Sequence, residues 1–196
     1  MFKKICIPLF TLILLCSCTG KKEISSENAG QKNAQPEASR EVKKMEIKVT
    51  SAAFQEGGAI PKQYTCDGAN VSPALAWTGV PEKAVTLALI VDDPDAPAKT
   101  WVHWVVFNLS ATAKGLPENV PAQENVAGGG RQGTSDFKKV GYGGPCPPSG
   151  THRYFFKLYA LDTSVADESK TTKEQLLKEM EGHVLAEGQL MGTYKR

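Results

Sequence analysis

The chain has 196 residues, of which 41% are hydrophobic, and is long enough for one hydrophobic core. Its 23 basic and 21 acidic residues leave a formal net charge of only +2. So nearly neutral a chain argues against non-specific nucleic-acid binding, because that binding requires clustered positive charge.

The N-terminus has the layout of a secretory signal. Lys3 and Lys4 form a basic start, and the apolar run Ile5–Leu15 follows them. This run is too short to span a bilayer, which needs about 20 apolar residues. We therefore expect residues 1–17 to be removed on export. Removing Lys3 and Lys4 from the 23 basic residues leaves 21, which equals the number of acidic residues.

The end of this segment resembles the lipobox of bacterial lipoproteins. In Leu15-Cys16-Ser17-Cys18 the small Ser17 precedes Cys18, as in that pattern, whereas the large Leu15 before Cys16 fits it poorly. The resemblance implies that Cys18 becomes a lipidated N-terminus, palmitate included, and ties the exported chain to a membrane of the bacterial cell envelope, facing the periplasm or the exterior. An ordinary cleaved signal that contains cysteines is the alternative, and which membrane holds the anchor stays open.

The segment after Cys18 predicts a flexible tether. It is rich in Lys, Glu, Ser, Asn, Gln and Ala and contains almost no large apolar residues. Such a segment cannot bury enough surface to offset the entropy of ordering it. We therefore expect three parts, namely a signal peptide in residues 1–17, the lipidated Cys18 with its tether in residues 18–45, and one folded domain in residues 46–196.

The folded domain begins with strand patterns. Ile47–Thr50 alternates apolar and polar residues, and Val85–Val91 is nearly continuously apolar, as expected of a strand buried on both faces. Val102–Asn108 and Arg153–Leu161 are two further predicted strands. Glycine and proline punctuate the segments between them, which is typical of sheet corners and long loops.

Helix signals appear only late in the chain. Thr172–Gln175 has the form of a capping box, and Leu176, Leu177 and Met180 supply an apolar face. His183–Met191 is predicted as a second short helix. Several strands, Gly/Pro-rich loops and few helices together predict a mostly β fold, a β-sandwich of antiparallel sheets with short C-terminal helices.

Two segments combine a rigid loop with a histidine. The first is Asp92-Asp93-Pro94-Asp95-Ala96-Pro97, followed by Trp101-Val102-His103-Trp104. The second is Gly141-Tyr142-Gly143-Gly144-Pro145-Cys146-Pro147-Pro148, followed by Gly150-Thr151-His152-Arg153-Tyr154. Each loop feeds a predicted strand and delivers a histidine at the entrance of that strand. The prolines restrict the loop backbones, and the glycines allow a ligand to approach closely.

These segments resemble the two signature motifs of the phosphatidylethanolamine-binding protein family, also called the Raf kinase inhibitor-like family. The resemblance covers essentially the whole of residues 46–196, and the tail Glu181–Gly188 is similar to the bacterial branch of that family. Membership would imply a PEBP-like sandwich of antiparallel sheets with a small anion-accepting pocket at one end. By this resemblance the pocket would be lined by Asp93, Asp95, Pro97, Trp101, His103, Gly144, His152 and Tyr154.

The residue types in this predicted pocket suit an anion. His103 and His152 can donate hydrogen bonds to a phosphate or a carboxylate, and a protonated histidine adds positive charge. The backbone N–H groups of Gly143 and Gly144 can also donate. We expect Asp93 to orient a histidine from behind, because a carboxylate that faces the ligand would repel it.

Side chains alternate along a strand, so the direction of each can be predicted. His152 and Tyr154 should share the pocket face, while Arg153 should point to the other face and pair with a carboxylate. His103 and Trp104 are neighbours in a strand, and they should likewise point to opposite faces.

Two of the five cysteines remain in the predicted domain, because Cys6 and Cys16 leave with the signal and Cys18 carries the lipid. The remaining pair, Cys66 and Cys146, favours a disulfide in an exported protein. Two separate buried thiols are the alternative that stays open.

The leading functional hypothesis is a non-catalytic binding protein. It would accept a small anionic or phosphate-bearing ligand, such as the phosphorylated head group of a phospholipid, and modulate a protein partner whose identity stays open. The chain has no Gly-x-Ser-x-Gly nucleophile elbow, and we assign no catalytic residue, cofactor or metal ligand. The alternatives are a metal-assisted hydrolase that uses the Asp/His cluster and a protein inhibitor of a kinase or protease.

Overall fold

The computed structural model describes residues 45–166 and 170–196 of the chain. The predicted signal peptide, the lipidated Cys18 and the tether up to residue 44 lie outside the described residues. Within the described ranges no helix is both long enough and apolar enough to cross a membrane.

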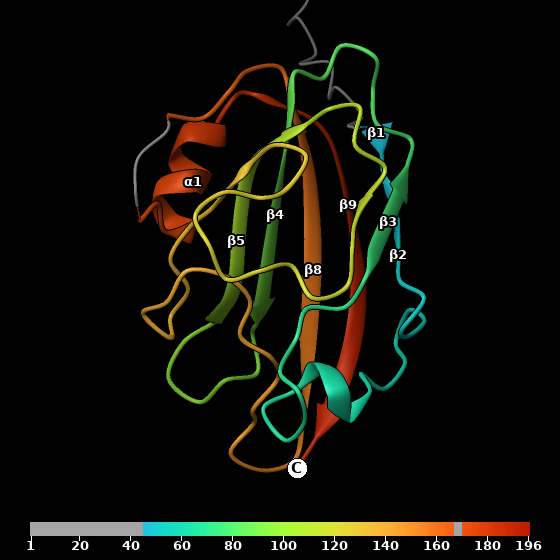
Figure 1. Ribbon diagram of the computed structural model, residues 1–196, viewed down its shortest axis with the longest axis vertical. Coiled ribbons are helices and arrows are strands. Elements are labelled where there is room, and N and C mark those ends of the chain that lie inside the picture. Colours follow the sequence, from blue (N-terminus) through green and yellow to red (C-terminus); the bar gives the residue numbers. More distant parts are fainter. Residues whose placement is uncertain (1–44, 167–169) are drawn as a thin grey trace, which may run out of the picture. The chain divides into compact units, whose positions relative to one another are not determined.

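Six strands form the larger sheet, in the order β1-β9-β8-β4-β5-β7 (Figure 1). Neighbouring strands are antiparallel except for β1 and β9, which are parallel. The central strand β4 is buried along its whole length, which explains its continuously apolar sequence. The bounds are β1 Met45–Glu46, β4 Thr86–Asp93, β5 Trp101–Ser110, β7 Arg131–Gln132, β8 Thr151–Leu161 and β9 Val184–Lys195.

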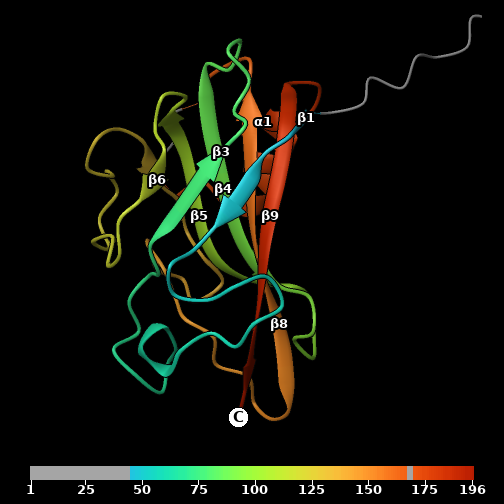
Figure 2. The ribbon, with the colours of Figure 1, turned by 90° about the vertical axis from the view of Figure 1, so that its right-hand side faces the viewer.

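A smaller sheet covers one face of the larger one (Figure 2). It consists of β2 (Lys48–Thr50), β3 (Leu75–Thr78) and β6 (Gly115–Leu116). The main hydrophobic core lies between the two sheets and contains Trp77 from the smaller sheet and Trp104 from the larger one. The predicted β-sandwich is therefore confirmed, and β2, β4, β5 and β8 correspond to the four predicted strands.

Helix α1, Lys173–Met180, packs on the opposite face of the larger sheet (Figure 1). Leu176 of this helix and Ile90 of β4 belong to a second buried cluster on that face. The helix begins with the predicted capping box. Thr172 Oγ1 accepts a hydrogen bond from the backbone N–H of Gln175 at 3.4 Å, and Gln175 Oε1 accepts one from the backbone N–H of Thr172 at 2.8 Å.

The predicted second helix at His183–Met191 is wrong, because most of this segment belongs to strand β9. Gly182, with φ +81°, ends the helical stretch in a backbone conformation that favours glycine. β9 then pairs with β8 along its length, and a Cβ at Gly188 would lie only 1.7 Å from the carbonyl oxygen of Ile47. These long-range contacts outweigh the local helix propensity of residues such as Leu and Met.

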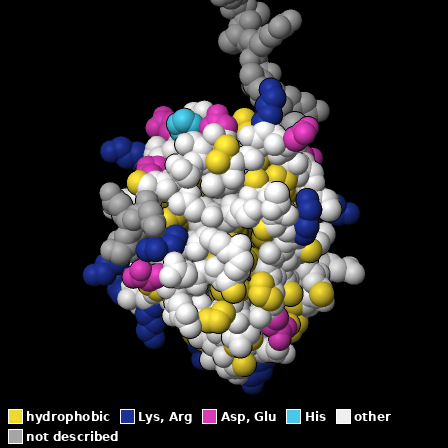
Figure 3. Space-filling view, turned by 45° about the horizontal axis from the view of Figure 1, so that its top comes forward, with side chains coloured by type: hydrophobic (Ala, Val, Ile, Leu, Met, Phe, Trp, Pro, Cys, Tyr) yellow, Lys and Arg dark blue, Asp and Glu magenta, His cyan; other side chains and the backbone are white. Residues whose placement is uncertain are grey.

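The surface carries charges of both signs. Figure 3 shows lysine and arginine side chains interspersed with aspartate and glutamate around the margins of one face, while uncharged groups occupy most of its centre. Hydrophobic side chains form small groups on this face. This distribution agrees with the small formal net charge of +2.

Candidate functional site

A cavity of about 270 Å³ opens at the end of the larger sheet where β4 ends and β5 and β8 begin. The antiparallel pairing brings these strand ends together, since Asp93 lies opposite Trp101 of β5 and Asp92 lies opposite Phe155 of β8. Loop residues complete the walls. The lining residues are Asp93, Ala96, Pro97, Trp101, His103, Phe137, Cys146, Pro147, Pro148 and His152.

Five of the predicted pocket residues meet at this one cavity. The two histidines line it together with Asp93, Pro97 and Trp101, although they come from motifs far apart in the sequence. The other three predicted residues do not line it; they are Asp95, Gly144 and Tyr154.

His152 is held by Asp93 at the cavity wall. Its Nδ1 lies 2.7 Å from Asp93 Oδ2, and both side chains are buried. Because an ionised carboxylate only accepts hydrogen bonds, Nδ1 carries the proton and Nε2 is the nitrogen that a ligand can use. The other carboxylate oxygen of Asp93 accepts the backbone N–H of Asp95 at 2.8 Å, which fixes Asp93 within the loop. Asp93 therefore orients His152.

His103 is fixed by a backbone carbonyl. Its Nδ1 donates to the oxygen of Gly143 at 2.6 Å, so Nε2 is again the nitrogen available to a ligand. Burial lowers the pKa of His103 below its ordinary value. Nearby carbonyls and carboxylates favour the protonated ring and act in the opposite direction, but burial is the larger effect; they belong to Gly143, Gly144, Asp93 and Asp92. We therefore expect His103 to be neutral at about pH 7 in the free protein.

A β-bulge places Trp104 on the same face of the sheet as His103, which contradicts the prediction that they point to opposite faces. Val91 and Asp92 of β4 pair with Trp104 and Val102 of β5, so His103 is the extra residue on β5. Trp104 therefore joins the main core directly beyond the cavity. Alternation along the sequence misses this, because one extra residue reverses the direction of every side chain that follows it.

Tyr154 lies behind His103 instead of on the cavity wall. The two rings meet edge to face with their centroids 5.2 Å apart, and Tyr154 is only 1% exposed. Its hydroxyl is buried close to the Asp93 carboxylate and to the backbone of Cys146. Burial first, and then the Asp93 carboxylate, raise the pKa of Tyr154 above its ordinary value. Tyr154 thus backs the imidazole and stays neutral.

The carboxylate of Asp95 is engaged by Arg153, which corrects its expected place in the pocket wall. Arg153 Nε and Nη2 donate to the two oxygens of Asp95 at 2.8 and 2.7 Å, and the Arg153 backbone N–H donates at 2.9 Å. Hydrogen bonds from Arg153 lower the pKa of Asp95 to about 2. The predicted pairing of Arg153 with a carboxylate is confirmed, and it ties the first motif to the start of β8.

The backbone N–H groups that were predicted to meet the anion already have partners. Gly143 N–H donates to the carbonyl of His103 at 3.0 Å, and Gly144 N–H donates to Asn70 Oδ1 at 2.7 Å. Gly144 lines a neighbouring cavity of about 120 Å³ instead. These two N–H groups therefore stabilise the loop, and the imidazoles of His103 and His152 are the polar groups that can contact a ligand.

Phe137 is the cavity residue for which the sequence holds no signal. It belongs to neither motif, yet its ring meets Trp101 and His103 edge-on, with centroid distances of 5.5 and 5.3 Å. The other lining residues that the sequence reasoning missed all lie within the two quoted motifs; they are Ala96, Cys146, Pro147 and Pro148. Because these residues lie in the proline-containing loops that precede the two histidines, the sequence could have indicated that they line the cavity.

Cys66 and Cys146 form a disulfide, with their Cα atoms 5.4 Å apart. It joins the loop after the short 3-10 helix η1, Lys62–Tyr64, to the second motif. The backbone N–H of Cys66 also donates to the carbonyl of Pro145 at 3.0 Å. Because Cys146 lines the cavity, the bridge fixes one of its walls.

The cavity combines apolar walls with two oriented imidazoles. Among the described residues, neither a lysine nor an arginine lines it, and the two imidazoles are the lining groups that can carry a positive charge. Among the residues that the structure describes, no group of three or more His, Cys, Asp or Glu side chains is placed to hold a metal ion. The metal-assisted hydrolase hypothesis therefore gains no support from this geometry.

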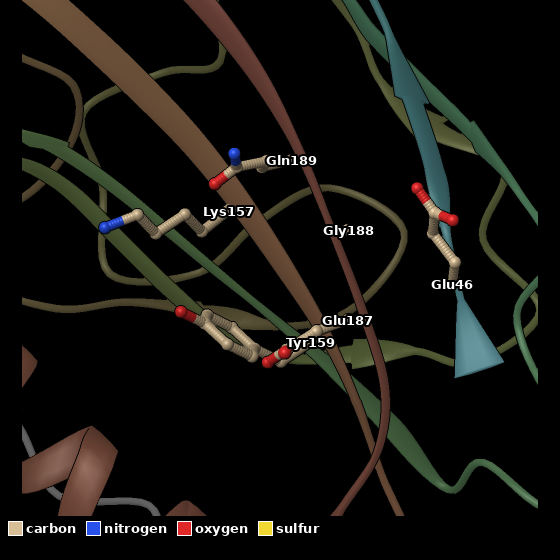
Figure 4. A pocket seen from close by; sticks show the side chains of 6 residues that line it. All are labelled: Glu46, Lys157, Tyr159, Glu187, Gly188 and Gln189. Carbon is tan, nitrogen blue, oxygen red and sulfur yellow. The ribbon is translucent and has the colours of Figure 1, made fainter. Parts of the chain in front are cut away.

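Larger hollows on the outer face of the main sheet have a different chemistry. One of about 500 Å³ lies over β1, β8 and β9 and is lined by Glu46, Lys157, Tyr159, Glu187, Gly188 and Gln189 (Figure 4). Figure 4 shows the Glu46 carboxylate and the Lys157 amino group on opposite sides of this hollow. Lys157 pairs with the buried Asp92 at 2.8 Å. None of the predicted pocket residues lies there, so we place the candidate site at the histidine cavity.

Comparison with known proteins gives a family match over most of the chain. The profile of the phosphatidylethanolamine-binding protein family matches residues 50–195. A UPF0098 protein of Methanothermobacter thermautotrophicus is 56% identical over 144 residues, covering 74% of this chain and 95% of the relative. A UPF0098 protein of Chlamydia muridarum is 46% identical over 155 residues, covering 76% of this chain and 99% of the relative.

Two solved structures share the fold. The phosphatidylethanolamine-binding protein homologue CT736 of Chlamydia trachomatis is 43% identical, with a TM-score of 0.72, and the match covers 77% of this chain and 98% of that one. The YBCL protein of E. coli, described as a new member of the mammalian PEBP family, is 33% identical, with a TM-score of 0.70, covering 77% of this chain and 99% of that one.

Proposed function

The chain belongs to the phosphatidylethanolamine-binding protein family, and from this premise we propose that its domain is a non-catalytic binding protein for a small anionic or phosphate-bearing ligand. The ligand would occupy the cavity of about 270 Å³ at the end of the larger sheet. A phosphorylated lipid head group and a free phosphate ester share the chemistry that this cavity recognises. Binding of such a ligand would in turn modulate a protein partner.

The observation that carries this proposal is the orientation of the two histidines. Both rings have Nδ1 engaged, His152 by Asp93 and His103 by the carbonyl of Gly143, which leaves Nε2 of each ring for the same ligand. The surrounding walls include Pro97, Trp101 and other apolar side chains, which exclude water from the contact. Two imidazolium N–H donors in such a setting form strong hydrogen bonds with an anionic oxygen.

Ligand binding should be coupled to proton uptake, because the histidines are the source of positive charge in this cavity. Burial holds the pKa of His103 low in the free protein, so at neutral pH the ring is uncharged. An anion at Nε2 favours the protonated ring and raises that pKa. By linkage, the anion then binds more tightly as the pH falls toward the pKa that His103 has in the free protein.

We accordingly expect the affinity for sulfate and for inorganic phosphate to rise as the pH is lowered from about 8 to about 5. Sulfate keeps its charge over this range, so its affinity reports protonation of the protein alone. The slope should reach at most about tenfold per pH unit for each proton taken up. Titration calorimetry in buffers of different ionisation enthalpy measures the affinity and the proton count together.

Two outcomes of this titration separate the parts of the proposal. Sulfate affinity that does not change with pH would show that the histidines do not carry the charge. No binding of either anion at millimolar concentration, with the protein folded, would refute the binding function itself.

We further propose that this protein is a lipoprotein of the bacterial Raf kinase inhibitor-like branch, anchored by acyl chains on Cys18 at the cell envelope. The support is the sequence Leu15-Cys16-Ser17-Cys18, which lies outside the described residues. Two or more acyl chains would hold it stably, since each buried CH2 contributes about 0.8 kcal/mol.

Replacing Cys18 with alanine is expected to abolish membrane association, whereas Cys16→Ala should leave it largely intact. The reason is that the small Ser17 precedes Cys18 and the large Leu15 precedes Cys16. Membrane sedimentation and metabolic labelling with palmitate measure the effect. A Cys18→Ala chain that still sediments with membranes and takes up palmitate would disprove the assignment.

A further inference from the structure

A second cavity adjoins the one that holds the histidines. Its volume is about 120 Å³, and its lining includes Asn70, Ser135, Phe137, Lys139 and Cys146. Phe137 and Cys146 also line the cavity of about 270 Å³. The two cavities are therefore neighbours that share one wall.

The shared wall reaches the protein surface. Cys146 is exposed and Phe137 is half-buried, so part of this wall is accessible to solvent. The backbone beside Phe137 is held in place, because Asp136 N–H donates to the carbonyl of Val102 at 3.0 Å and Asp136 Oδ2 accepts the N–H of Val102 at 2.8 Å.

The smaller cavity differs from the larger one in carrying a permanent cation. Lys139 is a lining residue there, whereas the described lining residues of the larger cavity include neither lysine nor arginine. Lys139 is exposed, and within the described parts of the chain its ammonium group forms no ion pair. By contrast, Lys99 pairs with Asp136 at 2.6 Å.

Three other polar groups of the smaller cavity are engaged within the protein. Ser135 Oγ donates to the carbonyl of Lys139 at 3.1 Å, Tyr142 Oη donates to the carbonyl of Tyr64 at 2.9 Å, and Gly144 N–H donates to Asn70 Oδ1 at 2.7 Å. Among the described residues that line this cavity, Lys139 is the one with a charged side chain, and its ammonium group would select an anion.

We propose that the cavity of about 120 Å³ is a second anion subsite and that the ligand of this protein is an extended molecule with two anionic groups. One group occupies the histidine cavity and the other contacts Lys139. This inference rests on the proposed function, since it assumes that the histidine cavity binds the first anionic group. The chemical class is a phosphate monoester or diester that carries a second phosphate or a carboxylate a short spacer away.

The test compares α,ω-alkanebisphosphonates of increasing spacer length with the alkylphosphonates of equal length, titrated into the full chain. For one spacer length we expect the bisphosphonate to bind about tenfold more tightly than its monophosphonate, because the second contact is intramolecular once the first is made. Lys139→Gln should remove this gain and leave the affinity for inorganic phosphate within about twofold of the original value. Lys138→Gln is the matched control, because it removes the same charge from the adjacent exposed residue, which lines neither cavity.

The results distinguish this inference from the proposed function. If inorganic phosphate binds but no bisphosphonate exceeds its monophosphonate, the second subsite is refuted and the histidine site stands. The second subsite is also refuted if the Lys139→Gln variant still binds the bisphosphonate more tightly than the monophosphonate. It is refuted as well if the Lys138→Gln variant loses this difference in affinity to the same extent as Lys139→Gln. If neither phosphate nor any phosphonate binds the folded chain, both proposals fail together.

Discussion

Binding of inorganic phosphate is expected to be lost in the double variant His103→Ala/His152→Ala, with an affinity at least about 100-fold lower than that of the original chain. A hydrogen bond to a charged group contributes roughly 1.5–3 kcal/mol, and two are removed. Within residues 45–166 and 170–196, neither a lysine nor an arginine lines the cavity to take over the charge. Titration calorimetry at about pH 6, where protonation favours binding, measures the loss.

Two further variants keep this experiment interpretable. His103→Asn/His152→Asn retains a short donor toward the Gly143 carbonyl and the Asp93 carboxylate, so the fold is preserved if the alanine variant proves unstable. His183→Ala is the matched histidine control, since His183 is exposed and pairs with Asp162 at 2.8 Å outside the cavity. Phosphate affinity that survives in both folded double variants would locate the anion elsewhere.

Removing the disulfide is expected to cost about 4 kcal/mol in free energy of unfolding. The double variant Cys66→Ser/Cys146→Ser frees a loop whose ends are separated by 80 residues, and this loop contains strands β3 to β7. In the chain-entropy model a loop of that length gains much conformational freedom in the unfolded state. Urea denaturation of the two chains, compared at one temperature, measures the difference.

The reduced form of the original chain is the control for this variant. It carries both thiols and no bridge, so its free energy of unfolding should match that of the double serine variant. Stability within about 1 kcal/mol of the oxidised chain in both forms would show that the loop is held by other contacts, such as the hydrogen bond from Cys66 N–H to Pro145.

Local patterns were sufficient for much of this fold. The alternation in Ile47–Thr50 and the continuous apolar run before Asp93 identified strands, because burial on one or both faces constrains every residue of a strand. Thr172 and Gln175 identified the start of the one described α-helix, since a capping box is made within four residues. Interactions between residues a few positions apart can be predicted from the sequence without knowledge of the tertiary structure.

The two motifs also located most of the cavity wall. The resemblance to a family identified Asp93, Pro97, Trp101, His103 and His152, and the loop-then-strand pattern by itself placed only the two histidines at strand entrances. That the two entrances meet depends on β4 lying between β5 and β8 in the sheet. The resemblance to a family supplied this arrangement, and the spacing of the motifs along the chain does not contain it.

The tertiary structure decided the remaining features, and each depends on a partner distant in sequence. The segment after Gly182 is a strand because β8 pairs with it. Asp95 does not line the cavity because its carboxylate is held by hydrogen bonds from Arg153. The bulge at His103 turns Trp104 into the core, and the fold alone brings Phe137 to the histidines. The sequence by itself thus determined strands β2, β4, β5 and β8, the start of α1 and the two histidines at strand entrances. The direction of individual side chains and the partners of polar groups were decided by long-range packing, because their energies depend on contacts that no short segment contains.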